Sequence, residues 1–357
     1  MTINDNLRDK LHLLKQDFSS RFVEQSAAAK QRALQFIEEG LPPDQKLAFL
    51  AKVNGMVGDQ LYHKQSPLAL SMVFTDQRQI LSTHPALLAS QLPGASSRIV
   101  LYVHGWCMAD TGWQRKGHKP DQLLAAAGYT AVFLRYNTGH HISQNGEELA
   151  TALEALIRAW PCEVTELVIV GHSMGGLVTR SACYYAEQCN YQWLHRLQTF
   201  VTLGTPHNGA PLARLASWID EQAATTPSLS FLQKLGEIRS SGTKDLSRGL
   251  IVHEDWLHTD KSPSHDEMQT RPRLPDQVHC FAVASCLGKN LHDEKNRRLG
   301  DGLVPVPSAL GESEQGMPAL NYADHGKWVG AGIHHIDLIC HPTVMAQIRQ
   351  WVLTHTL

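Results

Sequence analysis

The stretch VIVGHSMGGL, from Val168 to Leu177, decides how this chain folds. Residues 166–170 have the composition of a short buried strand, and residues 177–185 have helical spacing. Between them, Gly171 and Gly175 flank Ser173 in the pattern Gly-x-Ser-x-Gly, where the strand must turn so sharply into the helix that only glycine fits on either side. The pattern therefore predicts a strand, a tight turn and a helix, with Ser173 exposed at the tip.

A serine held in this way suits nucleophilic chemistry, because backbone N–H groups at the helix start can receive the oxyanion that forms at a carbonyl. The bare pattern arises by chance in about one chain in ten of this length. The alternative interpretation is a glycine-rich turn without chemistry. The strand before Ser173 and the helix after it favour the nucleophile.

Composition limits the classes of partner. The chain has 357 residues, enough for one large α/β domain with an appendage or for two ordinary domains. Its 32 basic and 34 acidic residues leave a net charge of −2, which gives no electrostatic footprint for nucleic acid or for an anionic membrane surface. We expect no nucleic-acid partner, and the sequence does not indicate an oligomeric state.

The cysteines and histidines indicate the compartment and the absence of cofactors. Seven scattered cysteines suit free thiols in a reducing compartment better than a disulfide framework. The N-terminus has no apolar stretch of signal-peptide length, and no segment approaches the roughly 20 apolar residues of a membrane span. The 20 histidines come without an HExxH or CxxC pattern. We therefore expect a cytoplasmic protein without an integral membrane segment, a metal or a cofactor.

Residues 1–62 form the first predicted unit, an N-terminal helical segment of two or three helices. Apolar residues recur at helical spacing from Leu7 to Phe22 and again from residue 33, Pro42 and Pro43 interrupt the pattern, and residues 46–61 resume it. The apolar stripe is expected to pack against the main domain or a partner chain, and a membrane-surface role is a weaker alternative.

Residues 63–357 form the second predicted unit, a catalytic domain. Short apolar runs alternate with amphipathic stretches, which predicts a mostly parallel central sheet with helices on both faces. The expected strands are 98–103, 130–136, 167–170, 199–203 and 278–284, with an antiparallel strand at 71–75, and the expected helices are 120–127, 145–159 and 174–188. Residues 211–276 interrupt this alternation and are either a lid over the active-site edge or an ordinary surface excursion.

A nucleophilic serine needs a histidine base and a carboxylate that orients the base, in the chain order Ser, Asp or Glu, His. Asp301 stands between two glycines in a tight turn, although Asp-Gly is also common in turns without chemistry. The pair His334 and His335 precedes the final predicted helix, 342–353, and either histidine could be the base. The oxyanion hole is expected from the N–H of Met174 and that of Trp106, in the loop after strand 98–103.

With these residues in place, the sequence resembles an α/β hydrolase of the lipase and esterase type, and is most similar to bacterial members of the group that includes GPI inositol deacylase-like hydrolases. The resemblance covers roughly residues 98–350. It rests on VHGW at 103–106, LRYNTG at 134–139, ISQNG at 142–146, GHSMGGLV at 171–178, LGTPHNGAPLAR at 203–214, DGLVP at 301–305 and HHIDL at 334–338.

This resemblance implies the α/β hydrolase fold, with Asp301 as the triad acid and His335 as the base. It implies that His207 and Asn208 line the pocket, where we also expect His104, Gly105 and His172. In calcium-binding bacterial lipases an aspartate similar to Asp337 helps to hold the metal, but this chain offers no convincing upstream partner for it.

The predicted function is cleavage of a small-molecule or lipid carboxylic ester through an acyl-enzyme on Ser173. A thioesterase or amidase could use the same machinery. A third hypothesis is a non-catalytic interaction protein that kept the hydrolase fold and binds partners through its N-terminal helices. The intact order of Ser173, Asp301 and His335 argues against it, because a degenerate site should have lost at least one member.

Overall fold

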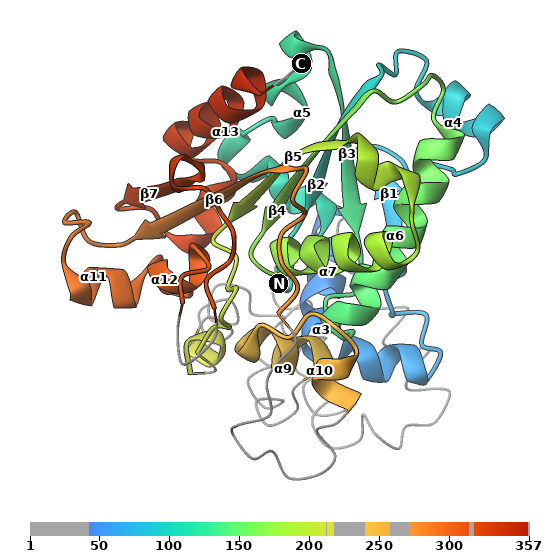
Figure 1. Ribbon diagram of the computed structural model, residues 1–357. Helices are drawn as coiled ribbons and strands as arrows, with labels where there is room; N and C mark the ends of the chain where they lie inside the picture. Colours follow the sequence, from blue (N-terminus) through green and yellow to red (C-terminus); the bar gives the residue numbers. More distant parts are fainter. Residues whose placement is uncertain (1–42, 212, 218–239, 258–270, 314–317, 356–357) are drawn as a thin grey trace, which may run out of the picture.

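A computed structural model describes residues 43–211, 213–217, 240–257, 271–313 and 318–355 (Figure 1). Its centre is a seven-stranded sheet with the order β1-β3-β2-β4-β5-β6-β7, in which β1 pairs antiparallel to β3 and every other pair is parallel. The strands are β1 Val73–Thr75, β2 Arg98–Val103, β3 Tyr129–Arg135, β4 Glu166–His172, β5 Leu197–Leu203, β6 His279–Cys286 and β7 Lys327–Ala331.

The central strands are buried on both faces, so their side chains supply two separate cores. Along β2, Leu101 and Val103 point into one core, while Val100 and Tyr102 point into the other. This two-sided burial explains why the strands appear in the sequence as continuous apolar runs. It confirms the predicted parallel sheet with helices on both faces.

Helices α6 and α7 cover one face and α13 covers the other (Figure 1). These three helices span Ile142–Ala159 (α6), Met174–Gln188 (α7) and Pro342–Thr354 (α13). The shorter helices are α4 Pro85–Gln91, α5 Pro120–Leu123, α11 Glu294–Leu299 and α12 Val306–Ala309. Short 3-10 turns lie at Asp110–Gly117, Ala125–Ala127, Gln192–Arg196, Asp324–Gly326 and His335–Ile339.

The N-terminal helix α3, Pro43–His63, packs onto the main domain, as expected for this part of the N-terminal segment. Its residues Val53, Met56 and Leu61 are buried in the same core as α6 and α7. The helix kinks at Val57, which has a non-helical backbone. The helices predicted before residue 43 lie outside the described residues, and the division of the chain at residue 62 stays a prediction.

The described part of the predicted insertion 211–276 includes the short helices α9 Ser241–Arg248 and α10 Glu254–Leu257. Helix α9 contacts α3 and α6, and both short helices are drawn below the sheet in the view of Figure 1. We call α3, α9 and α10 together the α3–α9–α10 cluster. Much of the insertion lies outside the described residues, and its role as a lid remains a prediction.

Several details of the fold differ from the sequence prediction, which also did not include the short helices α4, α11 and α12. Strand β7 was not predicted, because this edge strand is only partly buried and Lys327, Trp328 and Val329 do not form a fully apolar run. The expected helix 120–127 is two short pieces, α5 and the turn Ala125–Ala127, separated at Leu124. Helix α6 starts at Ile142, three residues before the predicted start.

The predicted free thiols are confirmed, since none of the seven cysteines, all of which are described, forms a disulfide. Within the part of the chain that the structure describes, no helix combines the length and the apolar character that crossing a membrane requires.

Candidate active site

Ser173 occupies the sharp turn between β4 and α7. Its backbone is left-handed, with φ 53° and ψ −123°, a conformation that side chains rarely adopt and that stores strain of order 1–3 kcal/mol. The Ser173 N–H donates to the carbonyl of Leu203 at the end of β5, over 2.8 Å. A Cβ on Gly175 would lie 2.3 Å from the Val103 carbonyl oxygen, so glycine is required there. The predicted strand, turn and helix are confirmed.

The predicted exposure of Ser173 is wrong, because only 2% of its surface is accessible. The loop after β2 lies against it: a Cβ on Gly105 would stand 3.0 Å from the Ser173 Cβ. Ser173 is therefore buried because the loop after β2 packs closely against its turn, and a Gly-x-Ser-x-Gly pattern does not reveal such packing. The lack of a side chain at Gly105 makes that packing possible.

Asp301 and His335 form the closest acid–base contact of the site. The His335 Nδ1 lies 2.7 Å from Asp301 Oδ2, and both side chains are buried. The other carboxylate oxygen accepts the N–H groups of Leu303 and Val304, at 3.0 and 2.8 Å. The His335 N–H also donates to the Asp301 carbonyl, over 3.0 Å. Side-chain and backbone bonds thus fix the imidazole through Nδ1 and leave Nε2 for other chemistry.

The end of β5 brings this pair to the serine. A Cβ on Gly204, the next residue after β5, would lie 2.9 Å from Asp301 Oδ2 and 3.1 Å from His335 Nδ1. The residue before it, Leu203, binds the Ser173 N–H. The structure therefore gathers Ser173, Asp301 and His335 around one strand end, although they come from three loops that are far apart in the sequence.

His172, next to Ser173 in the chain, contacts the backbone of His335. Its Nε2 lies 3.1 Å from the His335 carbonyl oxygen, and the two imidazole centroids are 4.8 Å apart. Burial, and then the neighbouring His335, hold the pKa of His172 well below its usual range. A neutral His172 can donate from Nε2 to the carbonyl and so fix the backbone that carries the base.

The two expected oxyanion donors come from different segments, the start of α7 and the loop after β2. Met174 is the first residue of α7, and the first four N–H groups of a helix have no partner within it. The Trp106 side chain binds to α3, since its indole Nε1 donates to the Gly55 carbonyl over 3.1 Å. The next residue, Cys107, is left-handed with φ 58°, and its N–H donates to Thr138 Oγ1 over 3.2 Å.

Gly55 is a structural residue that the sequence prediction missed. Its carbonyl also accepts from Ser240 Oγ at 2.7 Å, so it joins the loop after β2 to the insertion. A Cβ on Gly55 would lie 2.2 Å from the Cys107 Sγ and 3.1 Å from its Cα. The available signal was a glycine inside a helical pattern, which indicates close packing against another chain segment.

His104, one of the residues expected to line the pocket, is fully buried beneath the loop after β2. Its Nδ1 lies 2.9 Å from the Gly105 carbonyl oxygen, and its ring stacks on Tyr136 at 4.4 Å. Burial lowers the pKa of His104 to about 4, so the ring is neutral at pH 7.

His207 and Asn208, the other expected lining residues, tie neighbouring loops together. The Nδ1 of His207 lies 3.2 Å from Arg180 Nη1, and its Nε2 lies 3.0 Å from the Tyr322 hydroxyl. Asn208 donates to the Glu312 carbonyl over 3.0 Å. Both residues thus hold the site's surroundings, and their contact with substrate, like that of His104, Gly105 and His172, stays a prediction.

Asp337 already has two cationic partners. Arg115 Nε lies 3.0 Å from Oδ1, and Lys116 Nζ lies 2.9 Å from Oδ2. Burial opposes ionisation, but the bonds from Lys116 and Arg115 outweigh it and lower the pKa of Asp337. The described residues contain no group of three or more His, Cys, Asp or Glu side chains that could hold a metal ion.

Comparison with known proteins places the fold. Residues 95–272, about half of the chain, match the PGAP1-like alpha/beta domain family, and the match includes Ser173 but ends before Asp301 and His335. The chain belongs to the α/β hydrolase superfamily. A search of curated protein sequences finds no match to this chain.

Several solved structures resemble this α/β hydrolase in fold. Mature Bacillus licheniformis lipase BlEst2 is 17% identical, with 73% of this chain and 92% of that one covered and a TM-score of 0.46. Pyrococcus furiosus esterase Pf2001 is 14% identical, with coverage of 73% and 82% and a TM-score of 0.43. RedJ, a thioesterase of the Streptomyces coelicolor prodiginine pathway, is 13% identical, with coverage of 74% and 92% and a TM-score of 0.44. These similarities identify no substrate for this chain.

Proposed function

We propose that the protein is a serine hydrolase that cleaves carboxylic esters, with Ser173 as nucleophile, His335 as general base and Asp301 as the acid that orients it. One observation carries the proposal. The hydrogen-bonded pair of His335 and Asp301 lies against Gly204, and the residue before it, Leu203, accepts the Ser173 N–H. A nucleophile, a base and an orienting carboxylate at one strand end are the components of acyl transfer.

The reaction takes place in two halves. In the first, Ser173 Oγ attacks the acyl carbonyl as His335 Nε2 takes its proton, and the Met174 and Trp106 N–H groups stabilise the oxyanion. The tetrahedral intermediate collapses to an acyl-serine, and the departing alcohol receives the proton from His335. In the second half, water attacks the acyl-serine with His335 again as base, which releases the carboxylic acid and restores the serine.

Carboxylic esters are the proposed substrate class, and small-molecule and lipid esters are both included. The same machinery serves thioesters and amides, which differ in the leaving group that His335 must protonate. The free thiols support a reducing compartment, and a cytoplasmic location is part of this proposal.

The test is a substrate panel on the purified full-length chain. Nitrophenyl esters from acetate to laurate, acyl thioesters and anilides are compared for kcat/KM, with Ser173→Ala as the inactive variant and Ser90→Ala, an exposed serine on α4, as the matched control. We expect ester turnover in wild type and Ser90→Ala, and a loss of roughly 10⁴-fold or more in Ser173→Ala.

Faster turnover of thioesters or anilides would change the substrate class. A folded wild type that exceeds Ser173→Ala on no substrate would contradict the proposal and favour a non-catalytic protein.

A further inference from the structure

A cavity lies away from the proposed catalytic residues, between the α3–α9–α10 cluster and the start of α6. Its volume is about 520 Å³, which is within the range of small-molecule sites. Its wall is formed by α3, residues 69–72, the loop 137–141 with the first turns of α6, Ser241 of α9 and Trp256 of α10. Neither Ser173, Asp301 nor His335 lines it.

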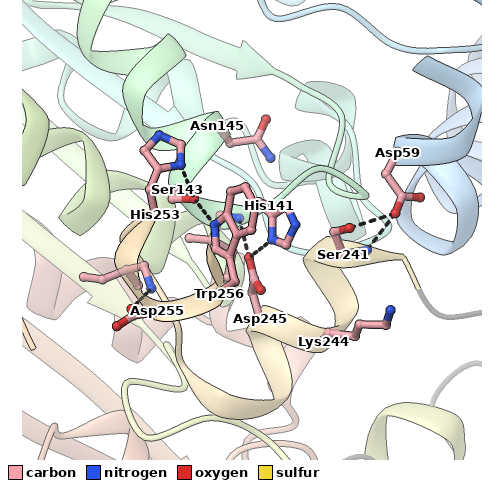
Figure 2. Close-up of polar contacts among 12 residues, drawn as sticks. Asp59, His141, Ser143, Asn145, Ser241, Lys244, Asp245, His253, Asp255 and Trp256 are labelled. Carbon is pink, nitrogen blue, oxygen red and sulfur yellow. Dashed lines mark hydrogen bonds and ion pairs between the residues drawn. The ribbon is translucent and has the colours of Figure 1, made fainter. Parts of the chain in front are cut away.

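Polar bonds between helices fix the shape of this cavity (Figure 2). Asp59 of α3 accepts from both the N–H and the hydroxyl of Ser241, each over 2.9 Å, which joins α3 to α9. Asp245 of α9 accepts from the Ile142 N–H, over 2.9 Å, and its Oδ2 lies 2.9 Å from His141 Nδ1, which joins α9 to the start of α6. The wall is therefore preformed, which reduces the ordering cost of binding.

Two pairs of aromatic rings border the cavity. Trp256 stacks on His141 with centroids 3.9 Å apart and planes 7° apart, and its Nε1 donates to Ser143 Oγ over 2.8 Å (Figure 2). Tyr62 packs edge-on against His140 at 4.7 Å. Burial lowers the pKa of His140 to about 4, and its buried Nε2 has no hydrogen-bond partner among the described groups. These rings offer apolar and π surface without positive charge from His140 at pH 7.

The charge of the wall is negative. Asp59 and Glu148 line the cavity, the buried Asp245 lies directly behind His141, and the lining contains no lysine or arginine. No ion pair joins Asp59 or Glu148 to a lysine or arginine within the described parts of the chain. Partial burial raises the pKa of Glu148. A bound cation would stabilise these carboxylates, and aromatic faces attract organic ammonium groups in particular.

We propose that the cavity between α3, α6 and α10 binds an organic ammonium ion, held by the Glu148 and Asp59 carboxylates and the aromatic rings of Trp256 and Tyr62. The site binds ligand without covalent chemistry and does not depend on Ser173. An ammonium headgroup on an ester substrate and a free amine share this chemistry.

The test is calorimetric titration of the full-length protein with choline, ethanolamine and 3,3-dimethylbutan-1-ol, the uncharged isostere of choline, at matched ionic strength. We expect saturable binding of at least one of the two ammonium ions and at least tenfold weaker binding of the isostere. Glu148→Gln should weaken ammonium binding at least fivefold. Glu187→Gln, the same charge change on the exposed end of α7, should leave it unchanged.

Because Glu148→Gln removes no hydrogen bond of the cavity wall, unfolding of the protein is not expected to obscure the result. Trp256→Leu provides a second variant, with thermal unfolding as its folding check. Equal binding of the isostere, unchanged affinity in Glu148→Gln, or no binding at tens of millimolar would each overturn the proposal. Repeating the titration in Ser173→Ala separates this outcome from failure of the proposed catalysis, since binding should persist there.

Discussion

The carboxyl edge of the sheet and the α3–α9–α10 cluster are built by different means. At the sheet edge, Ser173 directly follows β4 and Asp301 follows α11, and backbone N–H and carbonyl groups fix both residues by hydrogen bonds. In the cluster, helices distant in the sequence are joined through polar side chains, such as Asp59 with Ser241 and Asp245 with His141. Each such bond to a carboxylate contributes about 1.5–3 kcal/mol.

The two regions meet at Gly55. This carbonyl of α3 binds both the Trp106 indole of the loop after β2 and the Ser240 hydroxyl at the start of α9. The sheet edge thus carries the proposed reacting groups, while the cluster fixes the loop that carries one expected oxyanion donor. Substitutions at the sheet edge should therefore abolish turnover, and substitutions in the cluster should reduce it.

The largest effect is expected at the base. His335→Gln should lower kcat by about 10⁴-fold, because no group remains to take the serine proton. The neighbouring His334 is exposed, so His334→Gln is the matched control and should stay near wild type. Ester hydrolysis measured on both variants decides between the two histidines, and the reverse result would assign the base to His334.

The carboxylate should come next. Asp301→Asn should lower kcat by about 10³- to 10⁴-fold through loss of the His335 tautomer and orientation. Unfolding free energy should change little, because an amide oxygen can still accept the Leu303 and Val304 N–H groups. Kinetics and urea unfolding of the same sample check this. Near-normal activity would mean that another carboxylate serves as the acid.

A smaller effect is expected where the two regions meet. Gly55→Ala should lower kcat by roughly tenfold with KM almost unchanged, because the added Cβ must push Cys107 and hence the Trp106 N–H out of place. Gly94→Ala is the control, since nothing lies within 4 Å of a Cβ there. A rise in KM alone in Gly55→Ala would mean that α3 affects substrate binding instead of the oxyanion.

The last prediction concerns stability against pH and not turnover. Because the folded pKa of His104 is about 4 and the free value is 6.5, the unfolded state binds more protons between these pH values and stability falls as pH decreases. For this histidine alone, the loss from pH 7.5 to pH 5 is about 2 kcal/mol. Urea unfolding at both pH values should show a smaller loss in His104→Gln. An identical loss would show that His104 does not contribute.

Much of the sheet edge could be predicted from the sequence, because its features are local. The run that became β2 is apolar after Arg98, the run that became β5 mixes apolar residues with threonine, and the glycines around Ser173 indicate the tight turn. The candidates Asp301 and His335 could then be found because this fold requires the chain order serine, acid, histidine. Strand β7 was missed because an edge strand with a partly exposed face lacks the apolar signal.

The α3–α9–α10 cluster could not be predicted in the same way. Its contacts join residues far apart in the chain, such as Gly55 with Ser240, and each depends on the final packing. The burial of Ser173 was missed for the same reason, since it results from the approach of Gly105 from another loop. Periodicity locates elements along the chain, but it does not show which side chains of distant elements will bond.

The most direct test of the central claim is covalent labelling of the folded protein with a fluorophosphonate, followed by peptide mass spectrometry. We expect a single stoichiometric adduct on Ser173, absent in Ser173→Ala and formed much more slowly in His335→Gln. Labelling of a different serine, or no labelling of folded wild type, would contradict it.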